Sequence, residues 1–220
     1  MIKHILKIIW HQRRNNGWIF VELLLVFAVL CIMMDSLLVN LYTYYKPLGF
    51  DITNVYKVNI GKMSPEIPGY VPDSLLTTTD GEDLVRRAPQ VDEICLAMNS
   101  CPYTWSNSWS QLVRAGADTS VKANYYQMFN VTVSYFDVLR ISDREGRPIR
   151  PIVEESTGDI VISGDMETDF FQGRSGKGKQ VKWGSKSTTS ETVAAVTSPI
   201  RQNEYVKSKP CFYYLMRTDE

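Results

Sequence analysis

Hydrophobic residues fill one long stretch near the N-terminus of this 220-residue chain, and beyond it they alternate with polar ones in short runs. From Ile19 to Leu41 the sequence reads IFVELLLVFAVLCIMMDSLLVNL. As a helix this stretch spans about 34 Å, more than the roughly 30 Å hydrocarbon core of a bilayer. We therefore predict a transmembrane helix at residues 18–45.

The residues on either side of this stretch orient it. Four basic residues and no acidic ones lie in residues 1–18, which predicts a cytoplasmic N-terminus. A cleaved signal peptide is the alternative, but it has a shorter apolar core and a small-residue cleavage site. Here the apolar run ends in bulky aromatic residues typical of a membrane interface, Tyr42, Tyr44 and Tyr45. An uncleaved anchor is the better interpretation.

Residues 1–17 predict a cytoplasmic leader. Ile5, Ile8 and Ile9 fall on one face of a helix over residues 3–14, with basic residues around them. Such a pattern is typical of an amphipathic helix that lies on the inner leaflet.

Two acidic residues interrupt the apolar stretch, Glu22 and Asp35. A carboxylate at the bilayer centre costs about 2.5 kcal/mol or more. Glu22 is near the cytoplasmic end and can reach the interface. Asp35 is either close to the outer interface or protonated, or it faces another helix of the same membrane assembly. We retain both residues as candidates for intramembrane helix packing.

Residues 46–220 form the predicted external domain. Its fold class is α+β, with mixed sheets, short helices and two subdomains. A capping box at residues 79–82 and a hydroxyl at Ser134 predict two short helices, and a third follows at Asp165–Phe171. Alternation predicts strands at residues 54–62, 91–98, 121–126, 129–133, 159–163, 181–183, 191–196 and from 211 onward.

Charge balance and the positions of the histidines argue against some classes of function. With 24 basic and 24 acidic residues the net charge is +0, so no overall field favours nucleic acid as a partner. Both histidines, His4 and His11, lie in the leader, so the external domain lacks the commonest acid–base and zinc-binding residue. We predict no catalytic residue, no metal site and no cofactor in this chain, and hence no enzyme activity of its own.

Cysteines add one open question. Cys95, Cys101 and Cys211 lie in the predicted external domain, where disulfides persist, and Cys31 lies in the apolar stretch. Three is an odd number, so at most one pair forms. Cys95 and Cys101 are close enough in sequence to bridge, but spacing alone does not show that they do.

The octapeptide GRSGKGKQ, residues 173–180, nearly spells a phosphate-binding Walker A loop. Such a loop follows a strand and opens a helix, so that backbone N–H groups meet the phosphates. Here a predicted helix precedes the glycines, a strand follows, and Gln180 replaces the hydroxyl that binds magnesium. We predict a helix-to-strand turn, with Arg174, Lys177 and Lys179 in solvent.

Residues 131–197 resemble the periplasmic core domain of MacB-type ABC transporter permeases, of the FtsX-like superfamily. The segments that carry the resemblance are VTVSYFDVLRI, a Gly-Arg, DIVISGDMETDFFQGRSGKGKQVKWG and ETVAAVTSPIR. The matching positions are Val131, Tyr135, Phe136, Gly146, Arg147, Val161, Ile162, Phe171, Gly178, Lys179 and Val193. The order of basic helix, span and external domain is also similar, and the chain looks like an N-terminal fragment of such a permease.

What this resemblance implies is a non-enzymatic subunit in the bacterial inner (cytoplasmic) membrane, its main domain periplasmic or extracellular. A separate cytoplasmic ABC ATPase would bind ATP and magnesium, and a second permease copy would complete a dimer in the lipid bilayer. Further periplasmic or outer-membrane components are candidate partners. The implied role is export of, or resistance to, peptides, antimicrobials or lipoprotein-type substrates. Tyr135, Phe136, Gly146, Arg147, Phe171, Gly178 and Lys179 are structural residues of the family pattern.

Two other functions fit parts of the sequence. A membrane-anchored sensor would bind a ligand with the external domain and signal inward, and a histidine kinase or cyclase domain further along the chain would identify it. An anchored hydrolase is the weaker alternative, because the sequence contains no Gly-x-Ser-x-Gly elbow and no external histidine.

Overall fold

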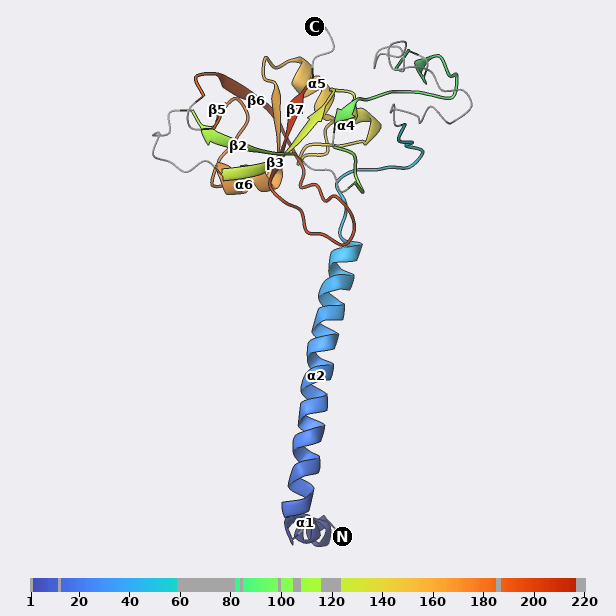
Figure 1. Ribbon diagram of the computed structural model, residues 1–220, viewed down its shortest axis with the longest axis vertical. Helices are drawn as coiled ribbons and strands as arrows, with labels where there is room; N and C mark the ends of the chain where they lie inside the picture. Colours follow the sequence, from blue (N-terminus) through green and yellow to red (C-terminus); the bar gives the residue numbers. More distant parts are fainter. Residues whose placement is uncertain are drawn as a thin grey trace, which may run out of the picture. The chain divides into compact units, whose positions relative to one another are not determined.

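The chain separates into two compact units, Met1–Lys46 and Pro47–Glu220. The computed structural model describes residues 2–11, 13–58, 82–83, 85–98, 100–104, 108–115, 124–184 and 187–216. The positions of the two units relative to each other are not determined, so each is described by itself (Figure 1).

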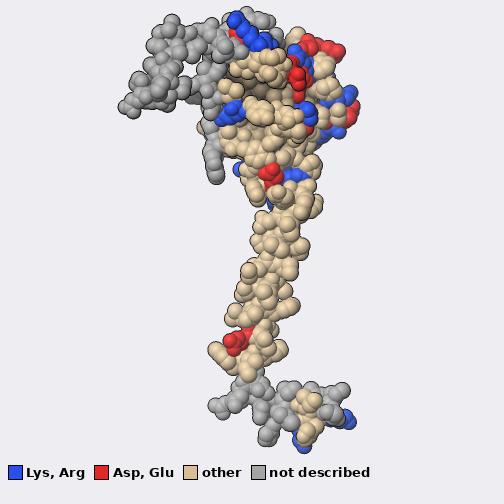
Figure 2. All heavy atoms as spheres, turned by 90° about the vertical axis from the view of Figure 1, so that its right-hand side faces the viewer, with Lys and Arg blue, Asp and Glu red and all other residues tan. Residues whose placement is uncertain are grey.

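The first unit is helical. Helix α1 spans Ile2–His11, which confirms the helix predicted for the leader, and α2 spans Arg13–Tyr45. The segment Gly17–Tyr45 of α2 is long and apolar enough to cross a membrane, and the apolar 18-residue window that shows this is not buried within the protein. On the face shown in Figure 2 this helix carries almost no charged side chains, as a lipid-facing surface requires.

The second unit is built around a small six-stranded barrel. Each strand is hydrogen-bonded to the next in the order β3-β2-β5-β6-β4-β7, and β7 pairs back to β3, which closes the ring. The β4–β6 and β3–β7 pairs are parallel, and the other four are antiparallel. The strands are β2 Ser108–Arg114, β3 Asn124–Val131, β4 Ile160–Ser163, β5 Gln180–Trp183, β6 Ser190–Thr197 and β7 Cys211–Leu215.

A short seventh strand, β1 (Ala97–Met98), pairs antiparallel with Val131 and Asn130 of β3. Because β7 occupies the opposite edge of β3 at these residues, β1 lies on the same edge as β2, beyond the end of that strand. Because the barrel is closed, each of its strands has a hydrogen-bonding neighbour on both sides, and no second sheet is needed to pair the backbone groups at the strand edges.

The barrel interior holds one apolar cluster, to which every barrel strand contributes. Helix α6 (Gly164–Phe170), which directly follows β4, adds Met166, Phe170 and Phe171 to this cluster, so the predicted apolar face of that helix is confirmed. Its N-cap is Ser163, whose hydroxyl accepts a hydrogen bond from the Met166 N–H at 3.2 Å. The strand residues of the interior are Leu112, Tyr126, Ile160, Ile162, Val181, Val193 and Phe212.

A second apolar cluster, here called the outer layer, covers the outside of β3, β4, β6 and β7. Alternate residues of these strands point into it, for example Val161 and Tyr213, whereas their neighbours Ile162 and Phe212 point into the barrel. Helices α4 (Tyr135–Val138) and α5 (Ile149–Glu154) lie over it in Figure 1 and supply further side chains, and Leu139 and Ile141 come from the segment between them.

The predicted fold class is confirmed in its coarse form, because the unit is a mixed α/β domain. The residues from Pro47 onward fall into one compact unit, and much of the predicted first subdomain lies outside the described residues, so the division into two subdomains stays a prediction. Of the predicted first subdomain, the described part supplies only β1 and a helical segment at residues 82–83 and 85–86.

Several local predictions need correction. No strand forms at residues 54–58, and residues 59–62 lie outside the described part. Of the strand predicted at 91–98 only β1 forms, and Leu96 directly before it donates its N–H to the Thr132 hydroxyl at 3.0 Å. The two strands predicted between 121 and 133 are one strand, β3, in the described residues. The sequence interpretation missed β2 and α5.

Candidate functional site

The segment Pro47–Val55, here called the connector, follows the membrane-length helix in the chain and belongs to the barrel unit. Two backbone hydrogen bonds fasten it there. The Arg201 N–H donates to the Leu48 carbonyl at 2.9 Å, and the Asp51 N–H donates to the Leu139 carbonyl at 2.9 Å. The connector is thus held by the β6–β7 loop on one side and by the end of α4 on the other (Figure 1).

Gly49 packs closely against the β6–β7 loop. Its φ is +85°, a conformation that glycine adopts without strain. A Cβ at this position would lie 2.5 Å from the Pro199 carbonyl oxygen and 3.3 Å from the Ile200 Cα. Backbone atoms cannot move aside as a flexible side chain can, so this contact requires glycine.

Asp51 orders the next turn of the connector. Its Oδ1 accepts hydrogen bonds from the Thr53 N–H at 2.8 Å and the Thr53 hydroxyl at 2.6 Å, and Oδ2 pairs with the Arg140 guanidinium. The Thr53 hydroxyl and N–H, together with Arg140, hold the pKa of Asp51 below its ordinary value. The carboxylate is therefore charged at neutral pH.

Apolar contacts complete the seating of the connector. Phe50 and Val55 pack against the outer layer, and the Phe50 ring meets the Tyr103 ring edge to face at 6.3 Å between centroids. Tyr103 donates its N–H to the Gln202 carbonyl at 3.2 Å and its hydroxyl to Glu204. Three segments far apart in sequence thus meet at the connector.

Arg201 holds the β6–β7 loop in the shape that receives the connector. Only 4% of this residue is exposed. Its Nε donates to the Val206 carbonyl at 2.9 Å, and its Nη2 donates to the Glu204 carbonyl. A buried guanidinium must be hydrogen-bonded to be tolerated, and here carbonyls of its own loop serve this purpose.

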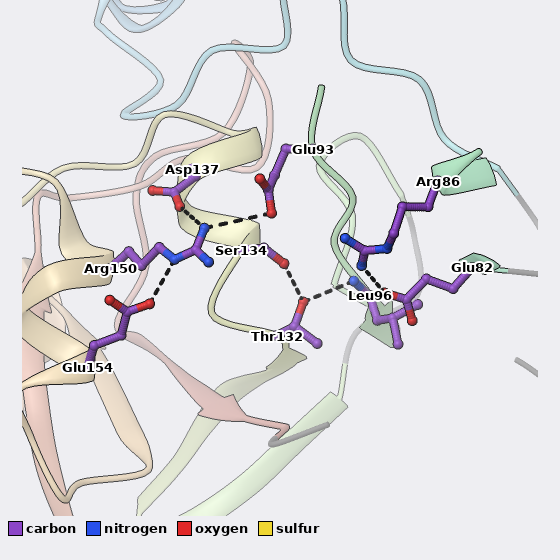
Figure 3. A network of polar contacts seen from close by, with 9 residues as sticks. All are labelled: Glu82, Arg86, Glu93, Leu96, Thr132, Ser134, Asp137, Arg150 and Glu154. Atoms are coloured by element: carbon purple, nitrogen blue, oxygen red, sulfur yellow. Dashed lines mark hydrogen bonds and ion pairs between the residues drawn. The ribbon is translucent and has the colours of Figure 1, made fainter. Parts of the chain in front are cut away.

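A polar network on α4 and α5 ties the segment before β1 to the outer layer (Figure 3). The Arg150 guanidinium lies 2.9 Å from Asp137, 2.8 Å from Glu154 and 3.7 Å from Glu93. Hydrogen bonds to Glu154 and Asp137 raise the pKa of Arg150 above its ordinary value. The pairs are solvent-exposed, so they orient the segments and add little stability.

Thr132 makes the second link in Figure 3. Its hydroxyl accepts the Leu96 N–H and lies 3.0 Å from the Ser134 hydroxyl. The prediction that Ser134 caps α4 is wrong in its detail, because the Ser134 side chain makes no capping bond to that helix. Its hydroxyl is directed to Thr132 instead.

The octapeptide at residues 173–180 is the predicted helix-to-strand turn, because it joins α6 to β5. Gly173 and Gly178 both have φ of +74°. The Gly178 N–H donates to the Val193 carbonyl at 2.8 Å, which begins the pairing of β5 with β6. Arg174, Lys177 and Lys179 are exposed, as predicted. A loop that leaves a helix directs no helix N-terminus at a phosphate.

Gly176 anchors this turn to the barrel. Its N–H donates to Glu167 Oε1 at 2.8 Å, and a Cβ there would lie 2.6 Å from the Ile162 Cδ1. Glu167 also pairs with the Arg144 guanidinium at 2.8 Å, and Arg144 donates to the Gly164 carbonyl at 2.8 Å. The buried Glu167 carboxylate therefore links the turn, through Gly176, to Arg144, and these three residues are here called the Glu167 fastener. The sequence interpretation did not single out Glu167.

A cleft of about 190 Å³ lies beside this fastener. On its other side Asp143 Oδ1 accepts the N–H groups of Glu145 and Arg147, each at 2.8 Å, and Oδ2 accepts Nε of Arg147 at 2.8 Å. Gly146, with φ of +79°, completes this turn. The lining residues are Asp143, Arg144, Glu145, Arg147, Ile152, Glu167, Ser175, Lys177, Ala195 and Val196. Equal numbers of cations and anions line it, so charge does not favour either kind of ligand.

The residues singled out in the sequence lie in several places. Tyr135 and Phe136 belong to the outer layer, and Phe171 belongs to the barrel interior. Gly146 and Arg147 form the turn beside the cleft, and Gly178 and Lys179 lie directly before β5. These positions build the fold and do not converge on one site.

Glu22 and Asp35 lie on α2, separated from the barrel unit in the chain by the rest of that helix. Their role in helix packing stays a prediction. Within the described residues, no group of three or more His, Cys, Asp or Glu side chains is arranged to hold a metal ion.

Comparison with known proteins gives similarity in structure only. No protein-family model matches the sequence, and no curated protein matches it. Among solved structures, the periplasmic region of MacB from Actinobacillus actinomycetemcomitans matches with 16% identity and a TM-score of 0.40, over 60% of this chain and 52% of that one.

The extracellular domain of the noncanonical ABC-type transporter YknZ from Gram-positive bacteria matches with 13% identity and a TM-score of 0.39, over 60% of this chain and 59% of that one. The chain thus spans between about half and three fifths of the length of these structures. Both structures are external domains of transporter proteins, and both match this chain at low identity and over only part of its length.

Proposed function

We propose that this chain belongs to the permease subunit of an ABC transporter and passes movement between a membrane helix and an external domain. The observation that carries the proposal is the connector. It continues the membrane-length helix in the chain and is fastened to the barrel by two backbone hydrogen bonds and by the close packing of Gly49. A displacement of the helix end would therefore move the barrel as a body.

The sequence pattern is a second, independent support for this function. The permease-like pattern over residues 131–197 folds into α4, α5, β4, α6, β5 and β6, which are parts of the rigid body that the connector holds. The basic leader and the apolar helix support a cytoplasmic N-terminus and an external barrel, which in this proposal lie on either side of a bacterial inner membrane.

In this function the chain carries out no chemistry itself. A cytoplasmic ABC ATPase would bind ATP and magnesium, and a second permease copy would complete the dimer. The transmitted movement would serve export of, or resistance to, peptides, antimicrobials or lipoprotein-type substrates. Asp35 and Glu22 would contact other helices of this assembly, where a carboxylate finds polar partners instead of lipid.

Capture from membranes tests the proposal. The full-length natural protein, extracted from its own membranes in a mild detergent and isolated by affinity tag, should bring with it an ABC ATPase that hydrolyses ATP. Mass spectrometry identifies the partner. Co-purification of a histidine kinase or cyclase without an ATPase would instead support the sensor.

A matched pair of variants then tests the connector. Asp51→Ala removes the Arg140 pair and both Thr53 hydrogen bonds, whereas Glu154→Ala removes an exposed ion pair on α5, outside the connector. We expect the first to reduce the ATP hydrolysis of the reconstituted complex severalfold, with ATPase binding unchanged, and the second to have no effect. Equal activity in both variants would contradict a transmitting role for the connector.

A further inference from the structure

The β6–β7 loop, residues 198–210, is tethered to the end of the membrane-length helix by a very short piece of chain. Helix α2 ends at Tyr45, and the Arg201 N–H of the loop donates to the Leu48 carbonyl at 2.9 Å. Three residues of fully extended chain span at most about 11 Å. Chain length alone therefore keeps the start of this loop close to the point where α2 ends.

The end of α2 has the residues of a membrane interface. Tyr42, Tyr44 and Tyr45 lie in its last turn, and the Lys46 ammonium lies 4.5 Å from the centroid of the Tyr42 ring. In a helix that spans a bilayer, tyrosines at such an end lie at the level of the lipid headgroups. A loop fastened three residues further along the chain is therefore held near those headgroups.

The loop has two lysines that its own structure does not use. Arg201 is buried and donates to carbonyls of the loop, and the Glu204 carboxylate accepts the Tyr103 hydroxyl. Lys207 and Lys209 are exposed, and neither forms an ion pair with a described residue. The charge that this loop presents to its surroundings is therefore positive.

An exposed tyrosine precedes these lysines. Tyr205 is 77% exposed, and its N–H donates to the Asn203 side chain at 2.9 Å, so the ring projects from an ordered turn. Exposure then alternates along the chain, since Tyr205, Lys207 and Lys209 are exposed and the residues between them are half-buried. A tyrosine with neighbouring lysines suits a lipid surface, because the ring packs among headgroups while the ammonium groups pair with phosphate.

Exposed apolar side chains concentrate around the connector. The described residues of the barrel unit include eight large apolar residues that are exposed. Five of them belong to the connector, to the residues just after it, or to the two segments that contact it: Ile52, Tyr56, Val58, Tyr103 and Tyr205, whereas Met98, Trp109 and Tyr125 lie elsewhere. The part of the domain that is tethered to the helix end is thus also its most apolar exposed part.

We propose that the β6–β7 loop binds the membrane surface beside the helix, with Lys207 and Lys209 on the phosphates of anionic lipid headgroups and the Tyr205 ring among them. Opposite charge and the short tether both favour this partner. The loop that receives the connector would then also hold the barrel at the bilayer. The inference rests on the proposed function, in which α2 spans the membrane and the barrel lies outside the cytoplasm.

Photo-crosslinking in defined bilayers tests the contact. The full-length chain is made with p-benzoylphenylalanine at one position, reconstituted into lipid nanodiscs and illuminated, and mass spectrometry of its peptides detects covalent lipid adducts. We expect a lipid adduct with the probe in place of Tyr205. We expect none with the probe in place of Glu155, the exposed C-cap residue of α5, which lies at the other end of the barrel unit (Figure 1).

Lipid composition and the two lysines test the role of charge. The adduct at position 205 should form severalfold more in phosphatidylcholine mixed with phosphatidylglycerol than in phosphatidylcholine alone. Combining Lys207→Gln with Lys209→Gln should abolish that difference, whereas Lys207→Arg with Lys209→Arg keeps the charge and should preserve it. Equal yields in the two lipids, or an unchanged difference in the glutamine variant, would overturn the proposal.

A third probe position separates this inference from the proposed function. With the probe in place of Phe27, an exposed ring in the apolar part of α2, lipid adducts should form in both bilayers. Adducts at position 27 but none at position 205, or adducts of position 205 with protein only, would overturn the lipid contact and leave the membrane helix standing. No lipid adduct at position 27 would contradict the membrane span and with it both proposals.

Discussion

The barrel interior and the connector hold the same domain together in opposite ways. The interior is an almost wholly apolar cluster from six strands and α6, in which Ile160, Ile162 and Phe212 are fully buried. The connector relies on directional contacts: two backbone hydrogen bonds, one glycine approach and an exposed carboxylate–guanidinium pair.

This difference means that one set of contacts makes the barrel rigid and another set holds the connector to it. Apolar burial is large in free energy and depends little on direction, so it makes the barrel move as one body. Hydrogen bonds and close backbone packing contribute less free energy but fix an orientation. We therefore expect substitutions in the interior to unfold the domain, and substitutions in the connector to change how it is held.

The largest effect is expected inside the barrel. Phe212→Ala removes a fully buried ring that meets Trp183 at 5.7 Å between centroids, and it should lower the free energy of unfolding by about 3–5 kcal/mol. Tyr125→Ala, on exposed β3 surface, should cost less than about 1 kcal/mol. Urea midpoints from pulse proteolysis in detergent micelles measure both. Equal shifts would show that the interior is not the main source of stability.

Next in size is the glycine of the connector. Gly49→Ala places a Cβ against the Pro199 carbonyl and forces a left-handed φ on alanine, so we expect a loss of about 2 kcal/mol or more. Gly146→Ala shares the positive φ but meets nothing within 4 Å, and it should cost only about 1 kcal/mol. Hydrogen exchange at the Arg201 N–H should increase only in the first variant. Similar exchange in both would contradict close packing at Gly49.

A smaller effect is expected at the Glu167 fastener. Glu167→Gln keeps an acceptor for the Gly176 N–H but loses the ion pair with Arg144, so we expect a loss of about 1–2 kcal/mol. Because Arg144 is half exposed, solvent screening sets the lower end of that range. Arg174→Gln, on the exposed surface of the same turn, is the control and should change the urea midpoint little. Full wild-type stability of Glu167→Gln would show that the pair contributes nothing.

The smallest effect concerns the dependence on pH at Asp143. Burial opposes its charge, but the N–H groups of Arg147 and Glu145 and the Arg147 guanidinium outweigh burial, and the pKa lies below its ordinary value of 3.8. The folded state therefore binds its proton less readily than the unfolded state. The resulting stability is present above about pH 4 and is lost as the pH falls through the folded pKa.

Asp143→Asn should therefore flatten the acid side of the stability profile. The measurement is the urea midpoint between about pH 2 and pH 6, compared with wild type. The variant should be less stable than wild type at neutral pH, with the difference shrinking below about pH 4. A difference that stays constant over this range would show that the charge of Asp143 is not its source.

The sequence-based predictions succeeded where pattern and local chemistry agree. The apolar helix, the strand at β4, the helix α6 with its buried Met166 and Phe170, and the turn at residues 173–180 all follow from neighbouring residues. They failed where the structure of a segment depends on a pairing strand that the local sequence does not reveal. Residues 91–96 alternate like a strand but find no ladder, and β2 carries too weak a pattern to be recognised without β3 and β5 beside it.

The candidate site was less predictable than the fold. The residues near Gly49 in the sequence do not predict that Pro199 lies against it. They also do not predict that the Leu48 carbonyl accepts the Arg201 N–H. These contacts join residues about 150 positions apart, beyond the reach of any local pattern. A glycine followed by an aromatic residue just after an apolar helix was the one signal that could have drawn attention to the connector.

By itself, the sequence determined the membrane-length helix, the basic leader, most barrel strands after residue 124 and the nature of the glycine-rich turn. Hydrophobic periodicity and glycine conformational freedom are local properties, and local residues are enough to express them. Only the tertiary structure decided the closure of the barrel and the packing of the connector against the β6–β7 loop. Each of these depends on distant segments that come together when the apolar surfaces of the strands are buried on both sides.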